Sequence, residues 1–224
     1  MIICHKHKFI FIKSPKTAGT SIQVVLEPFC GNNDVVTSMH PYEPPMARYR
    51  PRNDEGWHSH LSAREIRQKV SRAIWMSYFK FAFERNPWDR TVSNYWFRRW
   101  GRGDEAKKML DIMREDPVSI FPQWLKRTRL VSNYQMYTNQ HKEIIVNRIG
   151  LYEKLHEDFA HICNRIGLRD VQELPLTKAG YREDKRHYSE YYQGNQELID
   201  IVAAAYDWEI KTFGFKFENP YTPT

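Results

Sequence analysis

The 224-residue chain has few cysteines and no long apolar run, and each absence narrows the classes of protein it can belong to. Cys4, Cys30 and Cys163 are odd in number and widely spaced, which supports neither a disulfide framework nor a zinc cluster, and free thiols fit a reducing compartment. No stretch is long enough to cross a bilayer, and residues 1–8 contain no apolar core of signal-peptide length. We therefore expect a soluble, cytoplasmic protein.

Glycine is also scarce where a nucleotide-binding loop would use it, since the segment FIFIKSPKTAGTSI at residues 9–22 contains a single glycine. The GxxxxGK[ST] order of a Walker A loop is absent, which weakens an ATPase interpretation. The segment nevertheless predicts a buried strand, a tight loop and a helix, because an apolar run at residues 9–12 is followed by apolar residues at helical spacing. The helical set is Ile22, Val25, Leu26 and Phe29.

The loop between this strand and helix has the features of an anion site. Pro15 and Gly19 should turn the backbone sharply and leave unpaired amides at the helix N-terminus, where the helix dipole attracts anions. Lys16 adds a positive charge, and Thr20 and Ser21 add hydroxyl donors. The segment thus predicts a phosphate or sulfate site, and an ordinary strand-to-helix turn with an exposed lysine is the alternative.

A second strand, turn and helix is predicted at residues 79–95. Phenylalanines alternate at 79, 81 and 83, Asn86 is a good N-cap, and Pro87 suits the first helical position. Arg85 then ends the strand and Ser93 lies two helical turns beyond Asn86, so the two side chains can converge on one anion. For an isolated pair, a surface salt bridge and a solvated serine would be the alternative.

Together, PKTAGTS at residues 15–21 and RNP at residues 85–87, followed by Arg90, Ser93 and Tyr95, resemble the cofactor signature of sulfotransferases that use 3′-phosphoadenosine 5′-phosphosulfate (PAPS). The resemblance is to the carbohydrate and heparan-sulfate 2-O-sulfotransferase-like branch. It implies a P-loop-kinase-like topology, a PAPS donor and 3′-phosphoadenosine 5′-phosphate (PAP) as product. The implied contacts to the 5′-phosphosulfate are Lys16, Thr17, Ala18, Gly19, Thr20 and Ser21, and those to the 3′-phosphate are Arg85 and Ser93.

The same resemblance implies two further cofactor contacts, Lys178 and Arg182, in a basic loop that precedes Tyr191 and Tyr192. In the family an equivalent loop closes over the nucleotide. Here Thr177 and Ala179 replace the asparagine and serine usual in that loop.

His60 is the candidate general base. Ser62 and Glu65 form a capping box, which places this histidine just before a helix. A histidine pKa near ~6.5 suits removal of a proton from an attacking hydroxyl. His60 also resembles the second histidine of the HxH element of heparan-sulfate 2-O-sulfotransferases, with His58 at the first position. A helix-entry histidine without chemistry is the alternative, and zinc is not expected because two histidines at i, i+2 lack further ligands.

The net charge of +7 and the pI of about 9.2 suit several anionic partners: nucleic acid, a membrane surface, an acidic glycan or a charged cofactor. The proline-rich residues 41–57 are expected to form a long loop near the acceptor site, where Arg48, Arg50 and His58 would contact substrate. A plain connector is the alternative. We expect a hydroxyl-bearing acceptor, such as a glycan or small glycoside, and no nucleic acid and no membrane span.

Strands that alternate with helices predict one α/β domain over residues 1–224, in which helices flank a central parallel sheet. Helices are expected at 62–74, 87–99, 104–115, 118–127 and 196–212, and a strand at 144–146. The sequence thus predicts a cytoplasmic, nucleotide-binding sulfotransferase of carbohydrates. A P-loop-like small-molecule kinase or NTPase and a basic nucleic-acid-binding module remain the alternatives.

Overall fold

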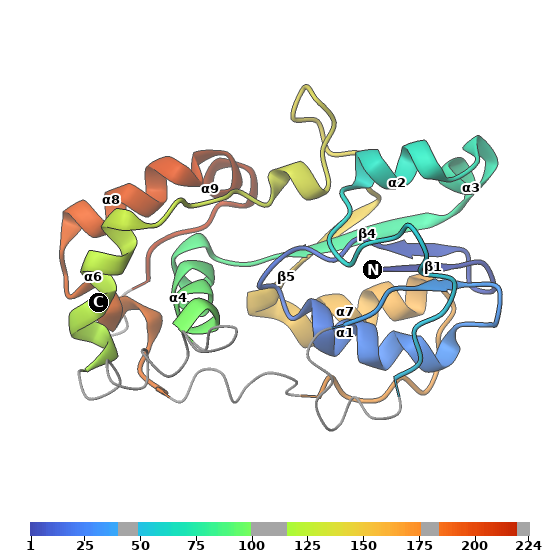
Figure 1. Ribbon diagram of the computed structural model, residues 1–224, viewed down its shortest axis with the longest axis horizontal. Helices are drawn as coiled ribbons and strands as arrows, with labels where there is room; N and C mark the ends of the chain where they lie inside the picture. The colour runs from blue at the N-terminus through green and yellow to red at the C-terminus, as the bar shows by residue number, and fades with distance from the viewer. Residues whose placement is uncertain (40–48, 100–115, 176–183, 219–224) are drawn as a thin grey trace. The chain divides into compact units, whose positions relative to one another are not determined.

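The computed structural model describes residues 1–39, 49–99, 116–175 and 184–218. The chain divides into two compact units (Figure 1). The first comprises Met1–Arg85 and Asn133–Lys178, and the second comprises Asn86–Ser132 and Ala179–Thr224. The assignment of the whole chain to a single domain stays a prediction.

A five-stranded sheet in the order β3-β1-β2-β4-β5 forms the centre of the first unit. The sheet is mixed, so the prediction of a purely parallel sheet is wrong for two of its four strand pairs: β1 runs antiparallel to both β2 and β3. The reason is the four-residue turn between β1 and β2, because so short a connection can join only antiparallel strands. The strands are β1 (Ile2–Cys4), β2 (Phe9–Phe11), β3 (Val35–Val36), β4 (Phe79–Glu84) and β5 (Arg148–Leu151).

The two strands that carry the predicted anion motifs are direct neighbours. β2 pairs with β4 in parallel, with Phe9 opposite Phe79 and Phe11 opposite Phe81. Their carboxyl ends therefore meet at the same edge of the sheet, where ligands of α/β proteins bind. β5 continues the parallel side beyond β4.

Helices cover both faces of this sheet (Figure 1). On one face, α1 (Gly19–Leu26) and α7 (Leu155–Arg165) pack against sheet residues in one apolar core. On the other side lie α2 (Ala63–Lys69) and α3 (Arg72–Ser77). They replace the single helix predicted at 62–74, because the Ser71 side chain accepts a bond from the Ile74 amide and caps a new helix.

The strand predicted at 144–146 is wrong, since the structure places β5 four residues later. Ile144 is 44% exposed and makes only an isolated bridge to Thr138. Within β5, Gly150 lies against the buried Phe83 ring, where a Cβ atom would come within 2.4 Å of Cε1. The position of the strand therefore follows the glycine that permits close packing against Phe83, and not the apolar run at 144–146.

The described part of the second unit is helical around an aromatic core. The predictions at 87–99 and 118–127 are confirmed within one residue, whereas 104–115 lies outside the described residues. The last predicted helix is two helices that meet at Tyr206, and the second ends at Gly214 with a φ of 70°. The elements are α4 (Pro87–Arg99), α6 (Pro117–Arg127), the 3-10 helix η6 (Tyr188–Tyr192), α8 (Gln196–Ala205) and α9 (Asp207–Phe213).

None of the helices in the described ranges is long and apolar enough to cross a membrane.

Candidate active site

The loop from β2 to α1 makes its turn at two residues in the left-handed region. Lys16 has a φ of 65° and Ala18 a φ of 60°, a conformation that non-glycine residues rarely adopt. We expected Gly19 to supply the turn, but its role is a close approach instead. A Cβ atom at Gly19 would lie 2.6 Å from Cγ of Lys13, so only glycine leaves room for that side chain.

The start of α1 offers donors suited to an anion. Its N-cap residue, Ala18, makes no side-chain capping bond, and the amides and dipole of a helix start favour an anion. Ser14 is buried, and its Oγ has no hydrogen-bond partner among the described residues. Thr17 Oγ1 donates to the Ser14 carbonyl oxygen at 3.0 Å, which braces the turn. This donor set fits a phosphate or sulfate group.

Lys13, which the sequence analysis missed, connects the strand end to the helix. Its side chain is buried, and its Nζ donates to Gln23 Oε1 at 2.9 Å. Gln23 is itself fully buried in α1. A buried lysine directly after a strand and before a predicted anion loop was the available signal.

His60 lies next to this loop within the first unit. Its Nδ1 is 2.8 Å from the Lys13 carbonyl oxygen. A carbonyl oxygen only accepts, so Nδ1 carries the hydrogen, and Nε2 of the neutral imidazole carries the lone pair. The predicted capping box is present: Ser62 accepts from the Glu65 amide, and Glu65 Oε2 accepts from the Ser62 amide at 2.8 Å. The hydrogen bonds of Glu65 with Ser62 lower the pKa of its carboxyl, which keeps that cap ionised.

Arg85 reaches the same loop from the end of β4. Its Nη1 donates to the Lys16 carbonyl oxygen at 3.3 Å, and its guanidinium carbon lies 3.8 Å from the centre of the Tyr152 ring. Arg85 is 8% exposed, so this cation–π contact is largely shielded from water. Tyr152 begins the 3-10 helix η4 (Tyr152–Lys154) directly after β5. The structure thus attaches both Arg85 and His60 to the backbone of the loop that contains Lys16, although the three residues are far apart in the sequence.

Glu84, a buried carboxylate that the sequence analysis did not select, is hydrogen-bonded to residues that hold the loop. Glu84 is fully buried and accepts from the Arg85 amide at 2.9 Å, from Tyr137 OH at 2.8 Å and from Asn133 Nδ2 at 3.2 Å. Asn133 Nδ2 also donates to the Pro15 carbonyl oxygen at 3.1 Å. Buried polar groups destabilise a protein unless their hydrogen bonds are made, and here these bonds join the ends of β2 and β4. No signal in the sequence indicated this role, because Glu84 is one of two charged residues, with Lys80, in the strand segment FKFAFE.

The remaining predicted site residues belong to other segments of the chain. Ser93 lies on α4 in the second unit, where the Asn86 side chain caps the helix by accepting from the Trp88 amide, as predicted. His58 and Arg50 are exposed, and Arg50 Nη1 donates to its neighbour's carbonyl oxygen. Arg48, Lys178 and Arg182 lie outside the described residues.

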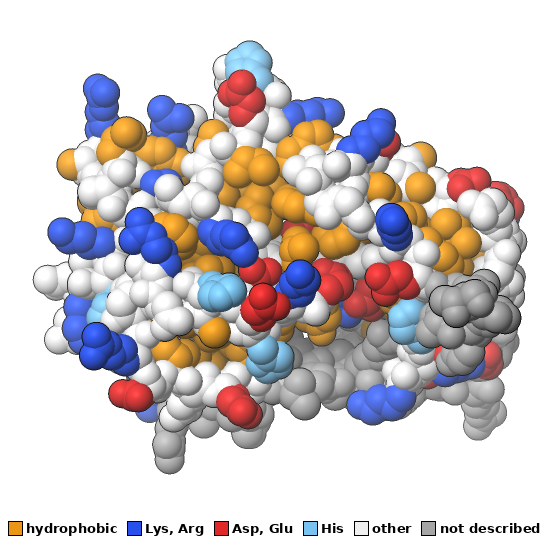
Figure 2. All heavy atoms as spheres, turned by 180° about the vertical axis from the view of Figure 1, so that it is seen from behind, with side chains coloured by type: hydrophobic (Ala, Val, Ile, Leu, Met, Phe, Trp, Pro, Cys, Tyr) orange, Lys and Arg blue, Asp and Glu red, His pale blue; other side chains and the backbone are white. Residues whose placement is uncertain are grey.

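The described part of the 41–57 loop returns to the sheet. Arg52 forms an isolated antiparallel bridge with Val36 and an ion pair with Glu27. On the face shown in Figure 2, acidic side chains lie among the basic ones. The net positive charge is thus not a continuous basic field on that face, which argues against reading it as a nucleic-acid surface.

The chain is similar to known proteins along nearly its whole length. A model of the sulfotransferase family matches residues 1–216. The chain is 23% identical to carbohydrate sulfotransferase 14 of Danio rerio over 256 residues, which cover 99% of this chain and 64% of that relative. It is 22% identical to carbohydrate sulfotransferase 10 of Homo sapiens over 256 residues, which cover 96% of this chain and 67% of that relative.

An uncharacterised protein of Archaeoglobus fulgidus is 29% identical over 119 residues, which cover 51% of this chain and 88% of that protein. No solved structure matches the chain.

Because the family match spans nearly the whole sequence, the chain belongs to the sulfotransferase family. It is a PAPS-dependent sulfotransferase, and members of this family use PAPS as sulfate donor and yield PAP. Among the three functions that the sequence left open, the family match selects sulfotransfer over the kinase and the nucleic-acid module.

Proposed function

We propose that this enzyme transfers the sulfuryl group of PAPS in line to a hydroxyl of a carbohydrate, with His60 as the general base. The observation that carries the proposal is that His60 and Arg85 both bond to backbone carbonyl oxygens of the loop that contains Lys16, at the carboxyl ends of β2 and β4. The carbohydrate acceptor is supported by the names of the relatives, two of which are carbohydrate sulfotransferases. We also propose a P-loop-kinase-like topology, with the donor loop between the parallel strand β2 and helix α1.

PAPS supplies the sulfuryl group and a good leaving group, so the residues of the chain need only bind, orient and move one proton. In the proposal, the backbone amides of residues 17–21 hold the 5′-phosphate, because they follow an uncapped helix start. The Lys16 ammonium neutralises charge that develops on the bridging oxygen. Thr20 and Ser21 add hydroxyl donors beside it.

His60 removes the acceptor proton through Nε2. Its Nδ1 donates to the Lys13 carbonyl oxygen, and this bond selects the tautomer with the lone pair on Nε2. The ring is thereby held to the same backbone that leads into the donor loop. Such anchoring reduces the orientational freedom that a base must otherwise lose in the transition state.

Arg85 binds the 3′-phosphate in the proposal, because its guanidinium is already fixed between Tyr152 and the loop carbonyl. Ser93, Lys178 and Arg182 are proposed as further nucleotide contacts. Arg48, Arg50 and His58 are proposed as acceptor contacts.

A His60→Ala variant tests the base assignment. We expect turnover to fall by about 10²–10⁴-fold, the usual contribution of general base catalysis, while the Kd for PAP stays within twofold of wild type. Turnover is measured as sulfate transfer from PAPS to a panel of glycans and glycosides, and PAP binding by calorimetry serves as the control for folding. A variant with normal turnover would show that His60 is not the base.

A matched titration with PAP and with ADP tests the donor site separately. PAP carries a 3′-phosphate and a 5′-monophosphate, whereas ADP carries a 5′-diphosphate and no 3′-phosphate. Tighter binding of PAP that disappears in Arg85→Ala, while ADP binding is unchanged, supports the assignment of Arg85. Equal affinity of the wild type for PAP and ADP would remove it.

A further inference from the structure

Three potential metal ligands meet at the opposite end of the sheet from the donor loop. Cys4 is the last residue of β1, Cys30 follows the 3-10 helix η1 (Glu27–Phe29), and Asp34 directly precedes β3. Cys4 pairs with Phe9, the first residue of β2, whereas the donor loop follows the last residue of that strand. This cluster is therefore separate from the sulfotransfer site.

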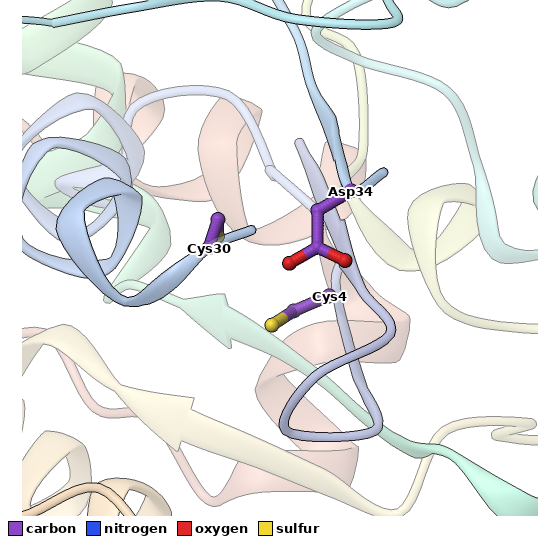
Figure 3. A group of neighbouring side chains, drawn as sticks. All are labelled: Cys4, Cys30 and Asp34. Atoms are coloured by element: carbon purple, nitrogen blue, oxygen red, sulfur yellow. The ribbon is translucent and has the colours of Figure 1, made fainter. Parts of the chain in front are cut away.

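The side chains of the cluster point toward one another (Figure 3). The two sulfur atoms and a carboxylate oxygen all lie within 4.8 Å of one another, and all three residues are buried. Zinc bonds of about 2.3 Å to sulfur and about 2.0 Å to oxygen, in a tetrahedron, would place such atoms roughly 3.5–3.8 Å apart. Binding a cation thus requires the donor atoms to move together by at most about 1.3 Å.

The carboxylate of the cluster is held by its surroundings. Asp34 Oδ1 accepts from the His5 amide at 2.7 Å, and Oδ2 accepts from the Gly31 amide at 2.7 Å. Outer hydrogen bonds of this kind orient a ligating carboxylate. The His7 amide donates to Cys4 Sγ at 3.4 Å, as amides do to metal-bound thiolates.

We propose that Cys4, Cys30 and Asp34 bind one Zn²⁺ ion as a structural site. Two sulfurs and one carboxylate oxygen form a donor set that zinc prefers, and a divalent cation would compensate the charge of three buried anionic ligands. The fourth position falls to water, since the cluster of mutually close donor atoms contains, among the described residues, only these three.

The ion would connect three segments of the first unit. β1, the end of the α1–η1 helix and the entry to β3 would share one centre, which adds a link where β3 has only two residues. Zinc that binds the folded chain alone raises its stability by mass action. The sequence analysis missed this site because 25 residues separate the two cysteines and only the fold brings them together.

The test uses the untagged full chain, freed of metal by a chelator and titrated with Co²⁺ and then Zn²⁺. We expect one ion per chain, a cobalt–thiolate charge-transfer band that Zn²⁺ abolishes, and a higher Tm with Zn²⁺. Cys30→Ser and Asp34→Asn should each weaken binding by more than about 100-fold. Cys163→Ala is the matched control, because Cys163 is also a buried free cysteine but lies in α7 outside the cluster.

If the variants fail to fold, the metal titration of the wild-type chain still tests the proposal. Less than a tenth of an equivalent of metal, or a cobalt spectrum without thiolate bands, would overturn the proposal. So would loss of two free thiols on mild oxidation in a chain that binds no zinc, since this outcome indicates a Cys4–Cys30 disulfide.

Discussion

Replacing Tyr152 tests how the structure positions Arg85 for the nucleotide. The Arg85 guanidinium lies 3.8 Å from the centre of the Tyr152 ring and is largely buried. A shielded cation–π contact contributes about 1–2 kcal/mol. If Tyr152→Leu removes this contact and lets the guanidinium leave its bound position, the Kd for PAP should rise by about 5–30-fold, because about 1.4 kcal/mol is tenfold.

The assay is calorimetric titration of wild type, Tyr152→Leu and Tyr152→Phe with PAP and with ADP. Tyr152→Phe keeps the ring and should bind PAP within about twofold of wild type. The loss in Tyr152→Leu should be confined to PAP, since Arg85 is assigned to the 3′-phosphate that ADP lacks. A Tyr152→Leu enzyme that binds PAP like wild type, or that loses PAP and ADP affinity equally, would refute the positioning role.

The remaining predictions concern stability. Gly19→Ala should lower the free energy of unfolding in urea by about 1–2 kcal/mol, because overpacking against Lys13 costs about 1–3 kcal/mol and exceeds the gain in helix propensity. The control is Gly31→Ala, whose Cβ would meet nothing within 3.8 Å and which should leave the stability nearly unchanged. Burial opposes ionisation of Asp184, but hydrogen bonds led by that from Arg186 lower its pKa to about 2. Its contribution to the free energy of unfolding is therefore complete above pH ~4 and is lost as the pH falls to ~2. When the urea midpoint is plotted against pH, the curve for Asp184→Asn should be flatter than that of the wild type between these pH values. Parallel curves for the two proteins would contradict this prediction.

Local patterns made the two motif segments predictable. The strand at 79–84, the capped start of α4 and the capping box before α2 each depend on neighbours within a few residues, and all are present. The direction of β1 was not predictable in this way. It depends on a four-residue turn whose last residue, Lys8, has a φ of 51°, and the sequence around it carries no glycine to mark it.

In the candidate site, too, residues in local sequence patterns were predictable and those that depend on long-range contacts were not. Lys16, His60 and Arg85 were identifiable because lysine, histidine and arginine stand in recognisable segments, whereas Glu84, Tyr137 and their partners were not. Two of the three donors to Glu84, Asn133 and Tyr137, lie 49 and 53 residues further along the chain and reach it only in the folded structure. No period or spacing in the sequence encodes such a long-range contact. The same holds for the ring of Tyr152 beneath Arg85.

The placement of the proposed base depends on the backbone path more than on any side chain. His60 bonds to the carbonyl oxygen of Lys13, and the path of that backbone is set by the turn at Lys16 and Ala18 and by the contact between Lys13 and Gly19. A change in this loop therefore moves the donor amides and the base together. Loop variants should lose PAP affinity and turnover in proportion, whereas a change of the imidazole alone should separate the two.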